Sequence, residues 1–377
     1  MSITTPGGFV AAGLAAGIKA SGALDLALVA TENGRPVPTA ATFTQNLACA
    51  APVQVSRAHM ASNGGRAAAV LVSSGNANAA TGDRGRADAA TMCHLTAEGL
   101  GVADDQVLVC STGLIGIPLP MGPIEAGIPR LVAARASGPD AGADAAAGIM
   151  TTDSGRKEVL VTYPTFTVAG MAKGAGMLAP NMATMLAFLT TDAAVEPGPL
   201  ADLLRSAVAD SFNSLTVDGC TSTNDTVVLM ASGTAGPCDP NVLADAVTEA
   251  CADLAGQMAA DAEGSSRIFQ VQVTGARSDG EAHRAARKVA DSLLVKCSVN
   301  GADPYWGRVA SELGSAGVDF DMDRLTIAYG GTTVCRGGIE VPYDHAAVAE
   351  HMAGSLVSIE CGLDLADGTG PDGPPDG

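Results

Sequence analysis

Thr184 ends a glycine-rich, turn-forming stretch, residues 173–184, and precedes a short apolar run, residues 185–189, that predicts a buried strand. Cleavage of the Ala183–Thr184 bond would give one residue both a hydroxyl nucleophile and a free α-amine able to act as its base. The pKa of an α-amine, about 7.7–8.0, suits a general base at neutral pH. A threonine that opens a strand can equally be only a good strand former, because β-branched residues favour strands.

A second chemical feature follows an apolar strand predicted over Val107–Cys110. The residues Ser111, Thr112 and Gly113 come directly after it, and we expect the strand to turn there. Backbone N–H groups at such a turn are unpaired and can point at a ligand oxygen, which is how an oxyanion hole forms. An ordinary turn would have the same sequence, so both interpretations stay open at this point.

Hydrophobic periodicity indicates the elements that must position these residues. The expected strands are 24–30, 40–46, 67–73, 107–110, 159–169 with a continuation to Lys173, 185–189, 227–231, 268–273 and 355–365. The expected helices are 86–99, one that follows a loop at 136–147, 197–212, 242–259 and one within 278–295. The linker that precedes the last of these helices places a domain boundary near residue 276.

The composition limits the classes of protein to which the chain can belong. Its 377 residues suffice for two or three domains, and with 3% aromatic residues the cores must consist mainly of Ala, Val, Leu and Met. The net charge of −19 argues against nucleic acid or anionic membranes as partners. The nine cysteines show no metal-ligand spacing, which predicts reduced thiols. Without a signal-peptide pattern or a bilayer-spanning run, we expect a cytoplasmic protein.

Several separated motifs resemble those of the ornithine acetyltransferase family, the self-cleaving bifunctional glutamate N-acetyltransferases of arginine biosynthesis. The resemblance runs from Gly8 to about Asp367. The motifs that carry it are 74–82, 111–113, 149–154, the Ala-Thr junction at 183–184, 217–226, 261–264 and 299–308. It implies an α+β fold with a layered helix/sheet/sheet/helix core of the N-terminal-nucleophile-like type. We expect this core over residues 1–276, a smaller α/β domain over 277–370 and a disordered tail over 371–377.

The resemblance also implies a reaction. Thr184 would attack the acetyl carbonyl of N-acetylornithine, hold the acetyl group as an ester and pass it to glutamate. Thr112 and Gly113 would stabilise the oxyanion. Lys173 is the candidate cation for a substrate carboxylate or for lowering the pKa of the amine. Neither a metal nor an organic cofactor is implied.

The same resemblance implies how small amino-acid substrates bind and how the chains assemble. Glu263 and a threonine of the 149–154 motif would contact substrate together with Lys173 and Thr184. Thr151 and Thr152 are both candidates, and we favour Thr152, because neighbours on a strand face opposite sides. Self-cleavage would give a heterotetramer of two α and two β chains.

Two departures from the family pattern affect substrate recognition. Cys220 stands where the family has an acidic residue. After Gly370 the family continues and closes with an Asn and a Thr or Ser that contact the amino-acid substrate, whereas this sequence reads Pro371–Gly377. We therefore expect the chemistry at the acetyl carbonyl to survive, with recognition of the amino acid weakened or shifted.

Two other interpretations remain open. The first is an N-terminal-threonine acyltransferase or amidohydrolase that acts on another acylated amino acid in specialised metabolism, which Cys220 and the different C-terminal residues favour. The second is a non-catalytic scaffold that never cleaves itself. The Ala183–Thr184 junction counts against a scaffold, because a scaffold has no need of that motif.

Overall fold

A computed structural model describes residues 1–178 and 185–365, which belong to two units. The first unit is Met1–Glu263, and the second begins at Gly264. The boundary lies before the expected position near residue 276, because the strand β11 (Ile268–Thr274) pairs with β15 (Leu356–Gly362) in the sheet of the second unit. Ala183, Thr184 and the predicted tail at 371–377 lie outside the described residues.

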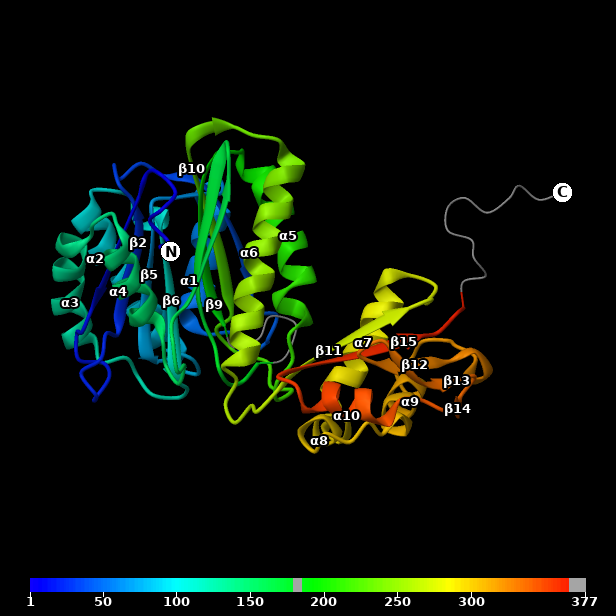
Figure 1. Cartoon of the computed structure of the whole chain (residues 1–377). Coiled ribbons are helices and arrows are strands. Elements are labelled where there is room, and N and C mark those ends of the chain that lie inside the picture. Colours follow the sequence, from blue (N-terminus) through cyan, green and yellow to red (C-terminus); the bar gives the residue numbers. More distant parts are fainter. Residues whose placement is uncertain (179–184, 366–377) are drawn as a thin grey trace. The chain divides into compact units, whose positions relative to one another are not determined.

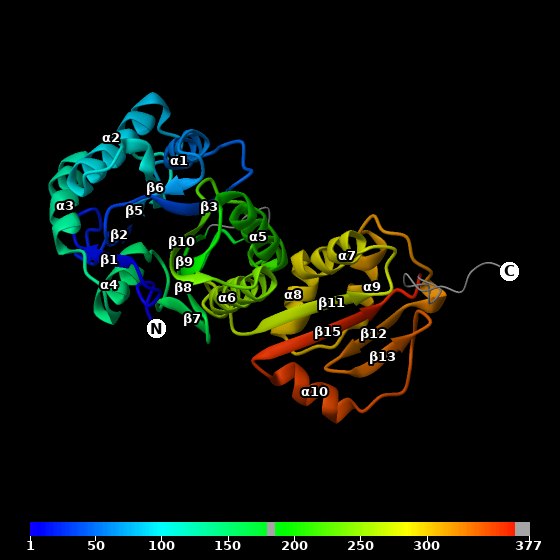
Figure 2. The same cartoon turned by 90° about the horizontal axis from the view of Figure 1, so that it is seen from above.

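Two β-sheets pack against each other in the first unit (Figures 1 and 2). The four-stranded sheet has the order β1-β2-β5-β6 and the six-stranded sheet the order β4-β3-β10-β9-β8-β7. The strands of the smaller sheet are β1 (Phe9–Leu14), β2 (Leu26–Thr31), β5 (Ala69–Asn76) and β6 (Val107–Leu114). The strands of the larger sheet are β3 (Val37–Phe43), β4 (Arg66–Ala67), β7 (Lys157–Tyr163), β8 (Phe166–Lys173), β9 (Leu186–Ala194) and β10 (Thr226–Pro237).

Helices cover the outer faces of both sheets (Figure 2). The smaller sheet packs on α2 (Gly82–Leu100) and α3 (Met121–Ala134), and the larger sheet packs on α5 (Pro197–Asp210) and α6 (Pro240–Ala260). The remaining elements of this unit are α1 (Ala51–Ser62), α4 (Pro139–Ile149) and the 3-10 helices η1 (Asp104–Gln106) and η2 (Phe212–Ser214). The expected helix/sheet/sheet/helix core is therefore confirmed.

Strand β9 shows why the sequence forms these layers. Phe188 packs in the core between the two sheets, whereas its neighbour Leu189 packs in the core under α5 and α6. Successive side chains of a strand point to opposite faces, so a strand buried on both faces must be apolar throughout. This is why the apolar run 185–189 predicts a central strand correctly.

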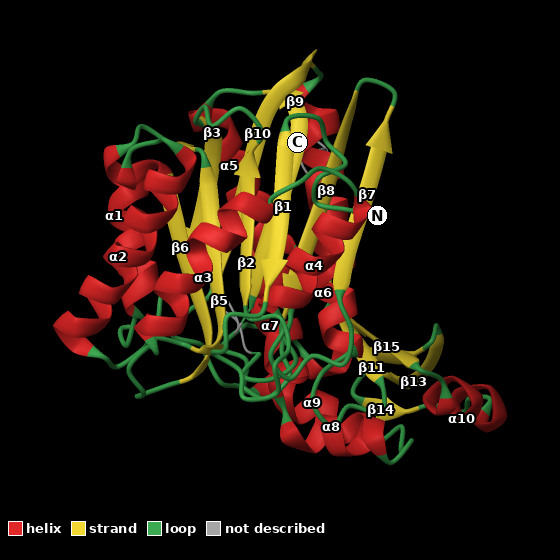
Figure 3. Cartoon of the chain, turned by 90° about the vertical axis from the view of Figure 1, so that its left-hand side faces the viewer, coloured by secondary structure: helices red, strands yellow, loops and turns green. Residues whose placement is uncertain are grey.

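The second unit has one five-stranded sheet, with the order β11-β15-β12-β13-β14. Its strands besides β11 and β15 are β12 (Thr326–Tyr329), β13 (Thr332–Arg336) and β14 (Ile339–Glu340). Its helices are α7 (Asp279–Asp291), α8 (Leu293–Asn300), α9 (Trp306–Gly314), α10 (His345–Ala353) and the 3-10 helix η3 (Met322–Arg324). Buried Tyr329 and Ile327 share a core with Leu313 of α9. The chain is thus an α+β protein, as Figure 3 shows by secondary structure.

One expected strand is in fact a hairpin. The residues 159–173 do not form a single strand, because β7 ends at Tyr163 and the chain reverses into β8 at Phe166. Pro164 lies at this reversal, and proline has no N–H group with which to continue a strand ladder. Among the described residues, no helix is long and apolar enough to cross a membrane.

We predict that Phe188→Ala destabilises the first unit by about 3–5 kcal/mol, because it leaves a cavity in the core between the two sheets. The measurement is the free energy of unfolding in a urea titration. Leu47→Ala is the matched control, because Leu47 is fully exposed and its removal is expected to change stability by less than about 0.5 kcal/mol. Equal stability of the two variants would contradict the packing of β9 against the smaller sheet.

Candidate active site

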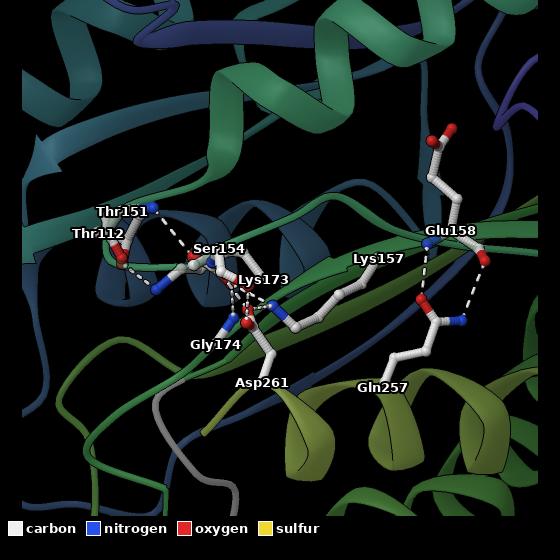
Figure 4. Close-up of polar contacts among 10 residues, drawn as sticks. Thr112, Thr151, Ser154, Lys157, Glu158, Lys173, Gly174, Gln257 and Asp261 are labelled. Carbon is white, nitrogen blue, oxygen red and sulfur yellow. Dashed lines mark hydrogen bonds and ion pairs between the residues drawn. The ribbon is translucent and has the colours of Figure 1, made fainter. Parts of the chain in front are cut away.

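Three adjacent strands of the larger sheet bring a lysine, a backbone N–H group and a carboxyl group to one end of that sheet. Lys173 is the last residue of β8, Met185 precedes β9, and Asp225 precedes β10. The register pairs Lys173 with Leu186, and Leu186 with Thr226, so these residues lie side by side. The smaller sheet contributes Thr112, whose Oγ1 lies 3.3 Å from Nζ of Lys173 (Figure 4). Both side chains in this contact are buried.

The Thr112–Gly113 segment is not the turn that we expected. Strand β6 continues to Leu114, because β5 runs beside it to Asn76 and offers pairing partners. The pairing is irregular there, since both Thr112 and Leu114 pair with Asn76. Gly113 has a φ of +133°, and a Cβ atom at this position would lie 2.3 Å from the carbonyl carbon of Gly75. A strand irregularity that requires glycine therefore shapes the candidate oxyanion site.

Asp153 is the centre of a buried network of charges. Its Oδ1 accepts hydrogen bonds from Nζ of Lys157 and from the N–H group of Gly174, both at 2.7 Å. Its Oδ2 accepts the N–H group of Thr151 at 2.9 Å. Burial alone would raise the pKa of Asp153, but Lys173, Lys157 and the two N–H groups outweigh burial and lower it below its usual value. The network thus joins the 149–154 motif to the glycine-rich stretch.

Lys157 extends this network to the end of α6. Its Nζ lies 2.6 Å from Oδ2 of Asp261, which also accepts the N–H group of Ser154 at 3.0 Å. The other oxygen of Asp261 bonds to the Ser154 hydroxyl. Burial would raise the pKa of Asp261, but Lys157 and Ser154 lower it. The charges of Asp153, Lys157 and Asp261 consequently hold three segments together, namely residues 151–157, the glycine-rich stretch at Gly174 and the end of α6.

Glu263 lies beside the glycine-rich stretch. Its N–H group donates to the carbonyl oxygen of Ala175 at 2.7 Å. A Cβ atom on Gly176 would lie 2.9 Å from the carboxyl carbon of Glu263, so this close approach depends on glycine. The carboxylate is exposed and free of the ion pairs described above.

The candidate threonines Thr151 and Thr152 lie near the same network. The alternation of side chains along a strand cannot show which of them faces the substrate. Thr151 and Thr152 lie in a bend before β7 and not in a strand. Our argument for preferring Thr152 therefore does not apply. Thr152 is exposed, whereas Thr151 is half-buried.

Two of the other four lysines in the chain, Lys19 and Lys157, lie close enough to influence the pKa of Lys173. Burial lowers the pKa of Lys173, and the two other lysines lower it further, while Asp153 and Asp225 oppose the change. A lysine with a lowered pKa exchanges its proton more readily near neutral pH. Within residues 1–178 and 185–365, no group of three or more His, Cys, Asp and Glu could hold a metal ion.

The loop 217–225 forms hydrogen bonds with Leu178 and Met185, the described residues on either side of residues 179–184. Val217 donates its N–H group to the carbonyl oxygen of Leu178 at 2.6 Å, and Leu178 donates to Oδ2 of Asp218 at 3.2 Å. Met185 donates its N–H group to Oδ1 of Asp225 at 2.9 Å. One loop thus positions both chain segments next to the predicted cleavage site, although Ala183 and Thr184 themselves lie outside the described residues.

Asn224 fastens this loop to the smaller sheet. Its side-chain amide donates to the carbonyl oxygens of Ala77 and Ser111, at 2.6 and 2.8 Å. Because Ser111 precedes Thr112, the bond fixes the candidate oxyanion strand relative to β10.

Sequence reasoning did not single out several of the residues that build this site. They are Lys19, Asp153, Lys157, Asn224, Asp225 and Asp261. One signal could have found two of them, since Lys19 and Lys157 are among only five lysines in a strongly acidic chain. Nothing in the sequence placed Asp261 next to Lys157, because the two are far apart along the chain and meet only through folding.

Comparison with known proteins identifies relatives along nearly the whole chain. The ArgJ family pattern matches residues 10–371. The arginine biosynthesis bifunctional protein ArgJ of Mycobacterium leprae is 49% identical over 377 residues, covering 97% of this chain and 90% of that protein. The protein of the same name from Thermobifida fusca is 44% identical over 370 residues, covering 98% and 95%. A solved structure of the Mycobacterium tuberculosis ornithine acetyltransferase complexed with ornithine is 45% identical, covers 48% of this chain and 94% of that chain, and has a TM-score of 0.46.

We predict that the stability advantage of the wild type over Asp153→Asn disappears in acid. Asp153 has a lowered pKa in the folded protein, so its contribution is present above its unfolded pKa of about 3.9 and is lost as the pH falls through the folded pKa. The measurement is the free energy of unfolding of both proteins from neutral pH into acid. The exposed Asp202→Asn serves as the control. A difference that grows in acid would contradict the assignment.

Proposed function

This chain belongs to the ArgJ family, and we propose that it is an acetyltransferase of arginine biosynthesis that moves an acetyl group from N-acetylornithine to glutamate. The observation that carries the proposal is the buried contact between Lys173 and Thr112 at the strand ends beside Met185. It supports a site in which a cation and a hydroxyl group lie close to the residue that follows Thr184. The relatives do not favour the amidohydrolase or the scaffold interpretation.

The proposed reaction begins with cleavage of the Ala183–Thr184 bond, which frees the α-amine of Thr184. Oγ of Thr184 attacks the acetyl carbonyl carbon of N-acetylornithine, while the α-amine takes the hydroxyl proton. The carbon–nitrogen bond of the donor breaks, the α-amine returns the proton to the leaving amine, and ornithine departs. The acetyl group stays on Thr184 as an ester. The amine of glutamate then attacks this ester, and Oγ recovers a proton as it leaves.

The oxyanion formed in each step needs hydrogen-bond donors that are already in place. We assign this role to Thr112 and Gly113. The irregular pairing of β6 with β5 supports the assignment, because it interrupts the regular strand register at Thr112. The hydroxyl oxygen of Thr112 accepts a hydrogen bond from Lys173.

Charges near the site suit an amino-acid substrate, which carries both a carboxylate and an amine. Lys173 is the proposed cation for the carboxylate or for tuning the α-amine of Thr184. The exposed carboxylate of Glu263 is the proposed partner of a substrate amine. Thr151 and Thr152 supply hydroxyl groups at the neighbouring bend. The proposal includes two chains, 1–183 and 184–377, a heterotetramer of two copies of each, and a cytoplasmic reaction.

We predict that Thr184→Ala leaves a single chain, because it lacks the hydroxyl group that cuts the Ala183–Thr184 bond. Intact-mass analysis of the purified protein measures this directly, and mass analysis after incubation with N-acetylornithine detects the acetyl ester. Thr184→Ser keeps a hydroxyl group and is expected to yield two chains. If Thr184→Ala still splits at the same bond, Thr184 is not the nucleophile.

We predict that Thr112→Val lowers kcat by about 10²–10³, the usual cost of losing one oxyanion donor. Valine keeps the branched shape of threonine but has no hydroxyl group. The measurement is the release of ornithine from N-acetylornithine in the presence of glutamate. Thr112→Ser is the matched control, because it keeps the hydroxyl group. A wild-type kcat in the valine variant would reduce Thr112 to a packing residue.

A further inference from the structure

Asp225 is a buried acid that the proposed mechanism leaves without a role. Asp225 is fully buried. Its Oδ1 accepts a hydrogen bond from the N–H group of Met185 at 2.9 Å. Its Oδ2 is also buried and has no hydrogen-bond partner among the described residues. Nearly all buried polar atoms in proteins are paired, so an unpaired carboxyl oxygen requires an explanation.

The backbone around Asp225 is anchored from several sides. Its carbonyl oxygen accepts the N–H group of Thr44 at 2.9 Å, and the next residue, Thr226, donates to the carbonyl oxygen of Met185 at 3.2 Å. The preceding residue, Asn224, is bonded to the smaller sheet as described above. The backbone of Asp225 is therefore held in place relative to both sheets.

The groups that face the carboxyl come from three elements. Lys173 on β8 is the charged group, Met185 before β9 supplies its N–H group, and the hydroxyl group of Ser222 lies near the carboxyl group without a hydrogen bond to Oδ2. Burial raises the pKa of Asp225 well above its usual value, although these three groups oppose the change. An ionised carboxylate here would favour the charged form of Lys173 and compete with Thr112 for its ammonium group. The uncharged acid leaves the contact between Lys173 and Thr112 undisturbed.

We propose that Asp225 is a positioning residue that holds the N–H group of Met185, the residue directly after the proposed nucleophile, through its hydrogen bond at the start of β9. This inference rests on the proposed role of Thr184 as the nucleophile. Asp225 acts through Met185, so we expect it to affect both self-cleavage and turnover.

The test compares two variants of similar size in the full chain. Asp225→Asn keeps the acceptor for Met185 and can never ionise, whereas Asp225→Leu has no acceptor. We expect Asp225→Asn to cleave and to release ornithine within about threefold of the wild-type rates. We expect Asp225→Leu to be slower by about 10²-fold in both, because it leaves the buried N–H group of Met185 unpaired. Intact-mass time courses measure cleavage, and ornithine release measures turnover.

Three outcomes would overturn the proposal. If Asp225→Asn is as slow as Asp225→Leu, the negative charge is required, and if both match the wild type, Asp225 positions nothing. The third outcome is independent of how well the leucine variant folds. A wild-type to Asp225→Asn rate ratio that rises with pH would make the carboxylate the active form, whereas a flat or falling ratio supports the uncharged acid. Thr184→Ala, measured in parallel, separates this result from a failure of the proposed function, because cleavage in that variant would refute the nucleophile itself.

Discussion

The buried ion pair between Asp153 and Lys157 is the interaction on which the candidate active site depends. A buried carboxylate is stable only when its charge is compensated and its oxygens are bonded, and removing one partner typically costs about 3–5 kcal/mol. Asp153 meets this requirement with Lys157 and with the N–H groups of Thr151 and Gly174. Asp261 completes the pairing of Lys157. This group of charges therefore holds the bend with Thr151 and Thr152 against the glycine-rich stretch at Gly174.

Each of the two sheets contributes different residues to the candidate active site. The larger sheet aligns Lys173, Met185 and Asp225 at one end of adjacent strands, and the smaller sheet supplies Thr112. Asn224 crosses between the sheets and fixes their ends relative to each other. Burial of these groups also alters their acidity, because the protein interior disfavours charge. The same packing that stabilises the core consequently sets the protonation states available for catalysis.

Much of the fold could be predicted from hydrophobic periodicity. Central strands such as β9 and amphipathic helices such as α6 lie where the sequence indicated them. The prediction was wrong at β7 and β8, where two alternating segments joined through Pro164 looked like one strand. It was also wrong at Thr112, where the Ser-Thr-Gly sequence suggested a turn. Whether that glycine ends the strand or continues it depends on β5, a partner that local sequence does not specify.

The sequence by itself determined the layered α+β class, the family resemblance and the residue types that could perform acyl transfer, because periodicity and motifs are local properties of the chain. The tertiary structure alone decided which of those residues meet. Lys157 and Asp261, or Asp225 and Met185, are distant along the chain and become partners only when the sheets pack. Their altered acidity follows from burial and from neighbouring charges, which are properties of a folded environment and not of any residue type.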